Sequence, residues 1–587
     1  MSSVAEHVSA DGALERIEFV PGARGHLYAW LGQPAAPGPA VLICSSICAD
    51  FTANYHRERL LARALLGRGI AVARFHYFGE GNSDGDARDV TLPSMIDDAT
   101  AVLDHLESQV SSGPIGFVGT RLGALVAAAI ARRRGAPLAL WEPLGEPLRF
   151  FDEAFRAKRM SQVVTDTGAA ATWREELDRN GVLDLLGYRV YPELVDSLEH
   201  ATPGVADPED PSVFVARFER RLRPPRETPA SRRPAKQDTA SFVVPESWWF
   251  HDESVTDSGD LIEVTARWLE GALSERGSSG TTGSAPQDPR TGQEQGLGNG
   301  SAVGAIDETP VFFDGPDACL AGVLTVPPEP NGLTVLLPWG SGAYPSSGRN
   351  RIRARLARAA AAEGFHAFRF DYSGRGESGG NYREGDLDDP FDADIEAACR
   401  LLAGRGLDRV VIVANCLGAW SALAAAPRLA GLEGMAIVRA PVGRHHYEVH
   451  GAQRSWREWL AALRRVRPAS VLDPRRRALH RKMLRGKIRS VAGPQLRDGR
   501  RRSPFSRSVE QLVRRRVPVL LLYSIDDDFH RDLQAELDAG LSSVLDQAGP
   551  RTRLLLVNER LKGLGTLDGQ DRVVKEVTAW LRELRAP

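Results

Sequence analysis

The sequence is poor in cysteine, and its cysteines form no pattern that marks a cofactor. The five of them (Cys44, Cys48, Cys319, Cys399 and Cys416) lack the spacings of zinc or redox motifs, and an odd number does not suit a disulfide framework. No stretch approaches the roughly 18 consecutive apolar residues of a membrane span, and the start, MSSVAEHVSA, lacks the pattern of a secretory signal. We therefore expect a cytoplasmic protein in a reducing compartment, without a membrane span, metal or cofactor.

The chain is too long for a single hydrophobic core. At 587 residues its length suggests several domains, while 42% apolar and 26% charged residues are ordinary for a soluble globular protein. Residues 276–303 are poor in apolar side chains and dense in Gly, Ser, Thr and Gln, which is typical of a flexible linker. We therefore predict two domains, at residues 1–275 and 304–587.

The two predicted domains repeat one another at a constant offset. A shift of 295 residues aligns FHYFGEGNSDG at 75–85 with FDYSGRGESGG at 370–380, and GTRLGAL at 119–125 with ANCLGAW at 414–420. One offset thus matches several features without a gap, as expected of an internal duplication.

Periodicity predicts the fold class of both halves. Short apolar runs at 39–44, 70–75 and 115–118, many of them β-branched, alternate with segments of helical length, and the second half repeats them. Each half closes with a related amphipathic helix, at 262–273 and 575–584. We predict an α/β protein in which each half is a mostly parallel, doubly wound sheet.

A candidate nucleophile lies at the centre of VANCLGA (413–419), between an apolar run and an alanine-rich helix. A strand, a tight turn of small residues and a helix form a nucleophile elbow, which lifts its central residue into the active site. Cys416 holds that position, and the amides at the start of the helix favour its thiolate. The oxyanion would be bound by the backbone N–H of Leu417 and a second one at Gly340 or Ser341 in PWGSGAY. The alternative is a buried, inert cysteine in place of a lost serine.

The glycine-rich loop at 370–380, followed by this elbow, resembles the α/β-hydrolase superfamily. Within it, the first half resembles the second of two hydrolases that accompany exosortase A systems, in GTRLGALVAA, LALWEPLGEPLRFFDEAFRAKRM and VLDLLGYRVYPELVDSL. The second half is similar to the first hydrolase of that pair, whose elbow also carries cysteine. The resemblance implies two tandem α/β-hydrolase folds, and it supplies no particular reaction.

The resemblance also implies where the acid of a catalytic triad would lie. In α/β-hydrolases a carboxylate that orients the histidine follows a late strand, and VPVLLLYSIDDDF ends in three acids. Asp527 is the choice by resemblance, with Asp526 and Asp528 as substitutes. The alternative is a solvated acidic turn.

The histidine of such a triad is missing. The family places it between the last strand and the last helix, where this chain reads ERLKGLGTLD (559–568). Candidate substitutes, each of which could instead be a surface histidine, are His445, His446 and His530. A thioester or activated ester needs less base assistance than an amide, so a cysteine without this histidine suits acyl transfer better than peptide hydrolysis.

In the first half, Arg121 occupies the elbow position, since it aligns with Cys416 at the offset of 295. A guanidinium stays protonated and is neither a nucleophile nor a base, so this half is expected to be non-catalytic. Arg121 would either bind a carboxylate or phosphate of a ligand at the start of the elbow helix, or pair with an acid of the protein itself.

A strongly basic insertion lies where α/β-hydrolases carry a cap. Residues 453–516 contain 21 Lys and Arg against four acids, a net charge of +17, whereas the whole chain has −2. Such a cap would attract a polyanion: an acidic carrier protein, an aminoacyl-tRNA or a CoA ester. The alternative is that it packs against acidic parts of the same chain.

The leading hypothesis is an acyltransferase or thioesterase in which Cys416 attacks a thioester or ester donor on an anionic carrier. The rival hypothesis is a pair of hydrolase-like domains that bind a ligand or protein without chemistry. The missing histidine favours the rival, whereas the elbow and Asp527 favour the enzyme.

Overall fold

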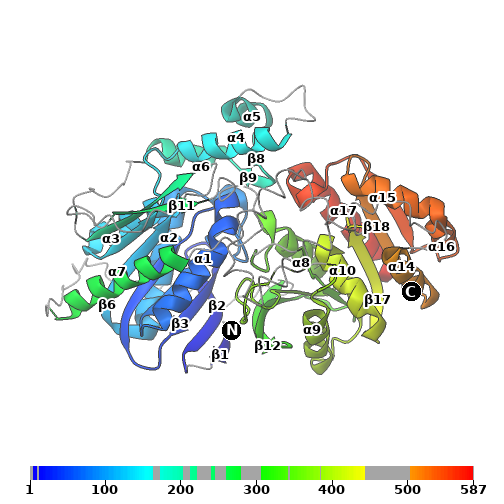
Figure 1. Cartoon of the computed structure of the whole chain (residues 1–587), viewed down its shortest axis with the longest axis horizontal. Helices are drawn as coiled ribbons and strands as arrows, with labels where there is room; N and C mark the ends of the chain where they lie inside the picture. The colour runs from blue at the N-terminus through cyan, green and yellow to red at the C-terminus, as the bar shows by residue number, and fades with distance from the viewer. Residues whose placement is uncertain are drawn as a thin grey trace, which may run out of the picture.

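A computed structural model of the chain shows two α/β halves side by side (Figure 1). The structure describes residues 4–9, 12–162, 172–201, 210, 212–220, 239–244, 259–278, 306–340, 344–383, 385, 387–442 and 503–585. In the described part of the chain, no helix is long and apolar enough to cross a membrane.

The first half is built on a nine-stranded sheet in the order β1-β2-β3-β5-β4-β6-β7-β10-β11. Its strands are β1 (Val4–Val8), β2 (Leu14–Pro21), β3 (His26–Gln33), β4 (Gly38–Cys44), β5 (Ala71–Phe75), β6 (Ser111–Thr120), β7 (Leu138–Trp141), β10 (Val213–Arg220) and β11 (Thr239–Val244). The pairs β1–β2, β2–β3 and β3–β5 are antiparallel, and all later pairs are parallel.

Helices cover both faces of this sheet, as predicted. The helices are α1 (Cys48–Leu66), η1 (Ala87–Asp89), α2 (Leu92–Val110), α3 (Gly123–Arg134) and α7 (Gly259–Ser278). Side chains of α1 and α7 share one core cluster with the sheet, and those of α2 and α3 share another. Helix α7 reaches Ser278, so residues 276–278 are helical rather than part of the predicted linker.

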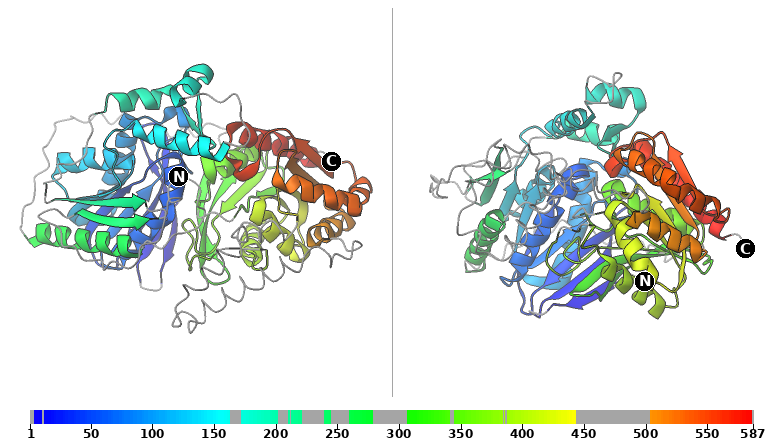
Figure 2. Two further views of the ribbon diagram at one scale, coloured as in Figure 1. Left: turned by 45° about the horizontal axis from the view of Figure 1, so that its top comes forward. Right: turned by 45° about the vertical axis from the view of Figure 1, so that its right-hand side comes forward.

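An insertion between β7 and β10 forms a separate layer above the sheet (Figures 1 and 2). It comprises α4 (Arg149–Gln162), α5 (Trp173–Asn180), β8 (Leu183–Leu185), β9 (Tyr188–Val190) and α6 (Pro192–Glu199). Strands β8 and β9 pair with each other as a hairpin and belong to neither large sheet.

The second half repeats the arrangement in an eight-stranded sheet of order β12-β13-β15-β14-β16-β17-β18-β19. Its strands are β12 (Asp307–Asp314), β13 (Cys319–Val326), β14 (Thr334–Leu336), β15 (His366–Phe370), β16 (Val410–Asn415), β17 (Leu432–Val438), β18 (Val519–Ser524) and β19 (Arg553–Val557). The first two pairs are antiparallel and the others parallel. The parallel strands are apolar on both sides because helices bury both faces.

The helices of the second half are η3 (Arg349–Arg351), α8 (Ile352–Ala362), α9 (Asp392–Gly404), α10 (Cys416–Ala425), η4 (Ala426–Arg428), α14 (Pro504–Arg514), α15 (Asp528–Glu536), η7 (Leu537–Leu541), α16 (Ser542–Asp546), η8 (Lys562–Leu564) and α17 (Leu567–Arg585). Helices α8 and α17 pack on one face of the sheet, and α9, α10 and α14 on the other. The α/β fold class predicted from the sequence is confirmed.

The two halves share a continuous core. The edge strands β1 and β12 lie side by side (Figure 1), and Ala321 and Val323 of β13 join the apolar cluster formed by Ile17, Tyr28 and Trp30 of the first half. The halves therefore meet through buried surface and not only through the segment that links them in sequence.

Candidate functional site

The elbow residue of each half has the strained backbone that a nucleophile elbow requires. Cys416, between β16 and α10, has a φ of +48°, and Arg121, between β6 and α3, has a φ of +52°. A residue with a side chain seldom adopts this left-handed conformation. Close packing fixes the turn, because a Cβ atom at Gly418 would lie 2.2 Å from the carbonyl oxygen of Trp339.

The predicted oxyanion-hole residue Gly340 lies against the elbow. A Cβ atom built at Gly340 would be 3.6 Å from Cβ of Cys416 and 3.5 Å from Oδ1 of Asn415. Cys416 is half-buried, and Leu417, whose backbone N–H was predicted as the other donor, is buried. Ser341, the alternative to Gly340, lies outside the described residues. The elbow and the loop after β14 therefore lie next to each other, as an oxyanion hole with one backbone N–H donor from each would require.

The predicted acid, Asp527, is paired with an arginine. Its carboxylate accepts hydrogen bonds from both Nε and Nη2 of Arg439, the latter at 2.9 Å, and both side chains are buried. Asp527 also caps α15 by accepting from the Phe529 amide at 3.1 Å. An acid held in this bidentate pair is not oriented toward a histidine, so the structure gives Asp527 a partner that the sequence analysis missed.

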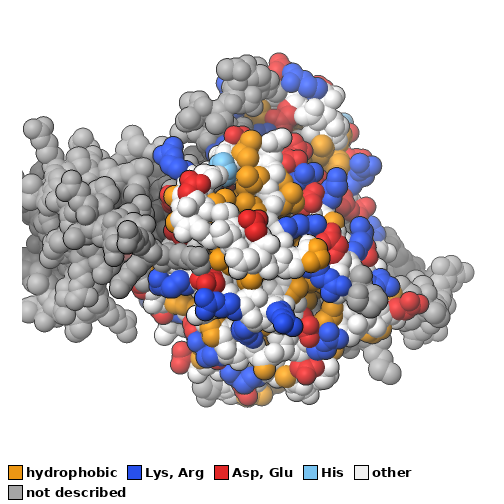
Figure 3. Space-filling view, turned by 90° about the vertical axis from the view of Figure 1, so that its right-hand side faces the viewer, with side chains coloured by type: hydrophobic (Ala, Val, Ile, Leu, Met, Phe, Trp, Pro, Cys, Tyr) orange, Lys and Arg blue, Asp and Glu red, His pale blue; other side chains and the backbone are white. Residues whose placement is uncertain are grey.

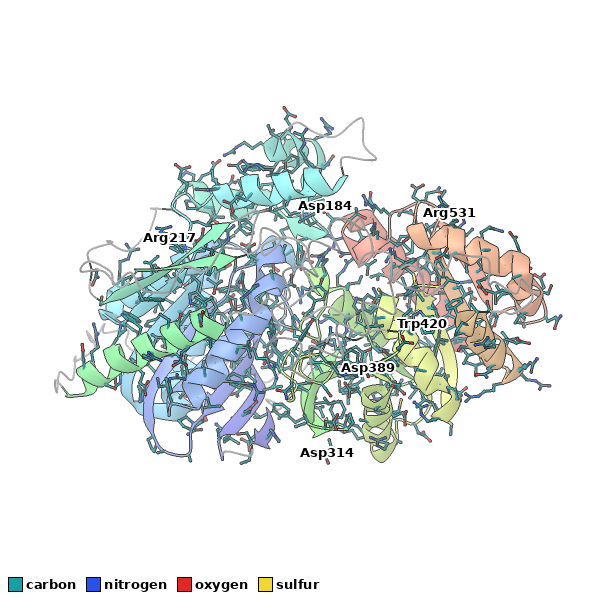
Figure 4. All side chains as sticks on the ribbon, viewed as in Figure 1. Asp184, Arg217, Asp314, Asp389, Trp420 and Arg531 are labelled. Atoms are coloured by element: carbon teal, nitrogen blue, oxygen red, sulfur yellow. The ribbon has the colours of Figure 1, made fainter. Side chains whose placement is uncertain are left out.

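Arg439 leaves the sheet next to the elbow. Strands β16 and β17 are parallel with Asn415 opposite Val438, so the following residues, Cys416 and Arg439, emerge side by side at the same sheet edge. Arg439 also has a left-handed φ of +48°. Trp420 of α10, labelled in Figure 4, donates its Nε1 hydrogen bond to the carbonyl oxygen of Pro441, which ties the elbow helix to the segment after β17.

Tyr523 completes the buried cluster around this pair. Its Oη donates to the carbonyl oxygen of Ala440 at 2.9 Å. Burial raises the pKa of Tyr523, and the charges of Asp527 and Cys416 raise it further against the opposing effect of Arg439. The phenol therefore stays protonated and is not the missing base.

The histidine candidates do not assemble a triad among the described residues. His530 lies in the first turn of α15, three residues after Asp527, and its amide donates to the Asp527 carbonyl oxygen. His445 and His446 lie outside the described residues, as does most of the basic segment 453–516. No group of three or more His, Cys, Asp or Glu in the described ranges could hold a metal ion.

The loop where a triad histidine would lie is a contact between the halves. Asp184, in the β8–β9 hairpin and labelled in Figure 4, accepts a hydrogen bond from the Leu567 amide at 3.0 Å. Gln570 of α17 donates to the Gly187 carbonyl oxygen at 2.9 Å, and a Cβ atom at Gly187 would be 2.6 Å from the Leu564 carbonyl oxygen. The first turn of α17 and the residues just before it therefore bind the first half.

Arg121 is neutralised within the protein. Its Nε donates to Asp50 at 2.8 Å and its Nη2 to Glu153 at 2.6 Å, and the arginine is only 2% exposed. Burial lowers the pKa of the guanidinium, but the two carboxylates more than reverse this effect. Of the two alternatives for Arg121, pairing with acids of the protein is the one that the contacts favour over binding a ligand anion.

The described end of the basic segment is also partly used inside the protein. Arg514 pairs with Glu510 on α14 at 2.7 Å, and Arg515 donates to the carbonyl oxygens of Ala426, the first residue of η4, and Leu429, which follows η4. These two arginines satisfy local groups, as the intramolecular alternative expects.

A small pocket lies beside the elbow and is lined by Trp339, Gly340, Tyr344, Gly348, Arg353, Phe370, Asp371, Tyr372 and Arg375. Asp371 is buried, and its Oδ2 accepts the amide hydrogen of Glu377 at 3.0 Å, whereas its Oδ1 has no hydrogen-bond partner among the described residues. Burial raises the pKa of Asp371 to about 7, because the opposing charge of Arg353 offsets only part of the desolvation. No motif in the sequence marks Asp371 as a site residue.

The replacement Asp371→Asn tests this carboxyl group through stability. Its pKa is about 7 in the folded protein against an ordinary value of 3.8, so between these pH values only the unfolded chain loses the proton. The contribution of Asp371 is therefore most favourable below pH 4 and is lost as the pH rises to about 7. We expect Asp371→Asn to be more stable than the wild type at pH 8 by a larger margin than at pH 4, measured by urea unfolding at both values. A margin that does not depend on pH would contradict the raised pKa.

A comparison with known families finds a match within the second half. Residues 334–557 match the model of the Alpha/beta hydrolase family. No curated protein matches the chain. The match does not distinguish the exosortase-associated families from other members, and that part of the resemblance stays a prediction.

Solved structures that resemble the chain include an esterase of Pyrococcus furiosus, with 14% identity, 48% of this chain and 90% of that chain covered, and a TM-score of 0.32. Another is the proline iminopeptidase of Mycobacterium smegmatis, with 18% identity, 48% and 99% coverage and a TM-score of 0.29. A third is an esterase domain from Rhodothermus marinus, with 16% identity, 47% and 99% coverage and a TM-score of 0.29.

Proposed function

We propose that the second half is an acyl-transfer enzyme in which Cys416 attacks a thioester or ester donor, while the first half takes no part in bond making. The observation that carries the proposal is the left-handed backbone of Cys416 at a strand–helix junction, with Gly340 directly beside it. The half-buried thiol of Cys416 lies at a helix N-terminus, where negative charge is stabilised. At this position of an elbow, a thiolate can attack the acyl carbon of a bound donor.

The proposed reaction has two steps. The Cys416 thiolate forms a bond to the acyl carbon, the backbone N–H groups of Leu417 and the Gly340–Ser341 loop bind the oxyanion, and the donor leaves as a thiolate or alkoxide. The acyl group then passes from Cys416 to water, an alcohol or an amine, the acceptor's proton goes to the released thiolate or alkoxide of the donor, and the Cys416 thiolate is restored.

The cation beside the thiolate in this proposal is Arg439 instead of a histidine. An adjacent arginine favours the thiolate form of cysteine, and Arg439 emerges from β17 next to the elbow. Asp527 holds the guanidinium in place through its bidentate contact. The arrangement supplies no proton acceptor, which suits activated donors better than amides.

The proposed donor is carried by an anionic partner: an acidic carrier protein, a CoA ester or an aminoacyl-tRNA. The support is the net charge of +17 of the segment 453–516, which is enough to attract such a partner. The described residues on the face in Figure 3 show both signs of charge interspersed among apolar side chains.

The test is a covalent adduct. We expect wild-type protein mixed with an activated ester such as p-nitrophenyl acetate to gain one acyl group on the Cys416 peptide, detected by mass spectrometry, and Cys416→Ala to gain none. Cys399→Ala is the matched control, since burial raises the pKa of Cys399 to about 12 and its thiolate is scarce at neutral pH. The same cause raises the pKa values of Cys44 and Cys48, and that of Cys319 to about 11.

A second candidate function is a non-catalytic binding module. The Arg439–Asp527 pair favours it, because the acid position of the fold is used for an internal ion pair. Absence of the acyl adduct between pH 6 and 9, with Cys416 no more reactive than Cys399, would decide for this candidate.

A further inference from the structure

Two glycine-rich loops, at 76–85 and 371–380, bring the halves together, and each is bound by an arginine of the other half. Arg351 of the second half donates to the carbonyl oxygens of Gly79 at 2.9 Å, Gly81 at 3.0 Å and Gly85 at 2.6 Å. Arg59 of the first half donates to the carbonyl oxygens of Gly374, at 3.4 Å, and Ser378. Four of these five hydrogen bonds are buried and the one to Gly85 is partly buried, so each half binds the loop of the other in a largely buried contact.

A buried carboxylate distinguishes the two loops. Glu377 of loop 371–380 is bound by Nη1 of Arg74, at 3.1 Å to each oxygen, and by the hydroxyl of Tyr55. At the offset of 295 the corresponding pair is Arg369 and Asn82, joined by a single hydrogen bond of 3.0 Å. The side chains of Arg74 and Glu377 are 4% and 2% exposed, so this ion pair is nearly shielded from solvent. The first half therefore holds loop 371–380 with a charge pair that has no counterpart on loop 76–85.

Loop 371–380 forms one wall of the pocket beside the elbow. Asp371, Tyr372 and Arg375 line that pocket together with Gly340, which adjoins Cys416. The Glu377 amide donates to Oδ2 of Asp371, so the residue bound by the first half is itself bonded to the pocket carboxyl group.

Loop 371–380 is bound from both halves. In the second half, the Gly379 amide donates to the Cys319 carbonyl oxygen at 2.7 Å and the Ser373 amide donates to Asp394 at 2.8 Å. The first half adds the hydrogen bonds of Arg59 and the contacts of Arg74 and Tyr55 with Glu377. Three glycines of the loop have a positive φ, which glycine adopts at low cost.

We propose that the first half is the positioning partner of the second half's site: Arg59, Tyr55 and Arg74 hold loop 371–380 so that the pocket beside Cys416 keeps its shape. Arg59 and Arg74 are positioning residues, since they act through the loop. The proposal rests on the proposed function only for the role of Cys416, and not for the dependence of the pocket on the first half.

The experiment uses the full chain with Arg59→Ala, which removes both hydrogen bonds to the loop. We expect amide hydrogen exchange in 371–380 to become roughly tenfold faster, because two hydrogen bonds from a charged donor are lost. We also expect iodoacetamide to alkylate Cys416 several-fold faster at pH 7, because the pocket wall opens.

The matched control is Arg189→Gln. Arg189 also crosses between the halves, donating to Asp571, but it lies away from loop 371–380 and Asp571 keeps Arg355 as a partner. We expect wild-type exchange and alkylation for this variant.

Two results would overturn the proposal: unchanged exchange in 371–380, or faster exchange with Cys416 alkylated at the wild-type rate. If Arg59→Ala does not fold, Arg59→Lys replaces it, since a lysine keeps the charge but loses the planar fork that reaches both carbonyl groups. Wild-type values for folded Arg59→Lys would also count against the proposal. The alkylation rate is compared with that of the wild type and does not depend on acyl transfer. A missing acyl adduct would therefore reject the proposed function without affecting the test of this proposal.

Discussion

Replacing Arg439 with methionine is expected to lower the local free energy of unfolding of the second half by about 3–5 kcal/mol, because Asp527 would keep a buried charge without its partner. Both residues are buried, so solvent cannot replace the guanidinium. The measurement is native-state hydrogen exchange of peptides from β17 and β18, which reports on this half without assuming that the whole chain unfolds at once.

The double variant Arg439→Met with Asp527→Asn separates the lost pair from lost packing. Removing both charges of a buried pair is often close to neutral, so we expect most of the stability to return. A double variant as unstable as Arg439→Met would show that packing around Arg439, including its position 4.1 Å over the Phe529 ring, matters more than the charge.

Replacing Arg121 with serine is expected to destabilise the first half by about 3–5 kcal/mol and to create no esterase activity. The serine would restore an elbow motif, but it would remove the cation that Asp50 and Glu153 share in a buried site. Hydrogen exchange of β6 and α3 measures the loss of stability, and hydrolysis of p-nitrophenyl acetate measures activity.

The control is Arg121→Ser combined with Asp50→Asn, because Asp50 is the more deeply buried of the two acids that bind Arg121. Glu153 keeps Arg149 as a partner at 3.0 Å, so this variant should recover much of the stability. Robust ester hydrolysis by Arg121→Ser in a chain that also carries Cys416→Ala, with none from Cys416→Ala alone, would show that the first half holds a usable triad. The proposed division of roles between the halves would then be wrong.

The sequence predicted those features that depend on local pattern. The fully buried run VVIVA of β16 and the small residues after it defined a strand, a tight turn and a helix, and the structure shows this elbow with Cys416 at its strained position. The offset of 295 predicted that the halves repeat one fold, and the strand order from β2 to β11 matches that from β12 to β19, with β1 as an additional edge strand of the first half.

Partners of buried charges were not predicted, because they depend on strand register and on contacts between distant segments. Arg439 and Asp527 are 88 residues apart, and only the alignment of β17 with β16 and β18 places the arginine beside the elbow. The Arg74–Glu377 pair spans 303 residues and both halves. A sequence pattern could have marked Arg439 only as an arginine directly after a buried strand.

The absence of a triad histidine from residues 559–568 was predicted from the sequence. The contact that this loop makes with the first half was not. The sequence showed only that 559–568 contains no histidine. The hairpin β8–β9 that binds there belongs to an insertion of the first half, and nothing local to either segment indicates that they meet.

The contacts of the β8–β9 hairpin also bear on when the halves can assemble during synthesis of the chain. Asp184 and its partner Leu567 are 383 residues apart, so the first half has left the ribosome long before α17 is made. The β8–β9 hairpin can therefore dock on α17 only after nearly the whole chain has been made. A nascent chain that stops short of Leu567 leaves Asp184 and the Gly187 carbonyl group without these partners. Such a chain would expose this interface to chaperones and proteases.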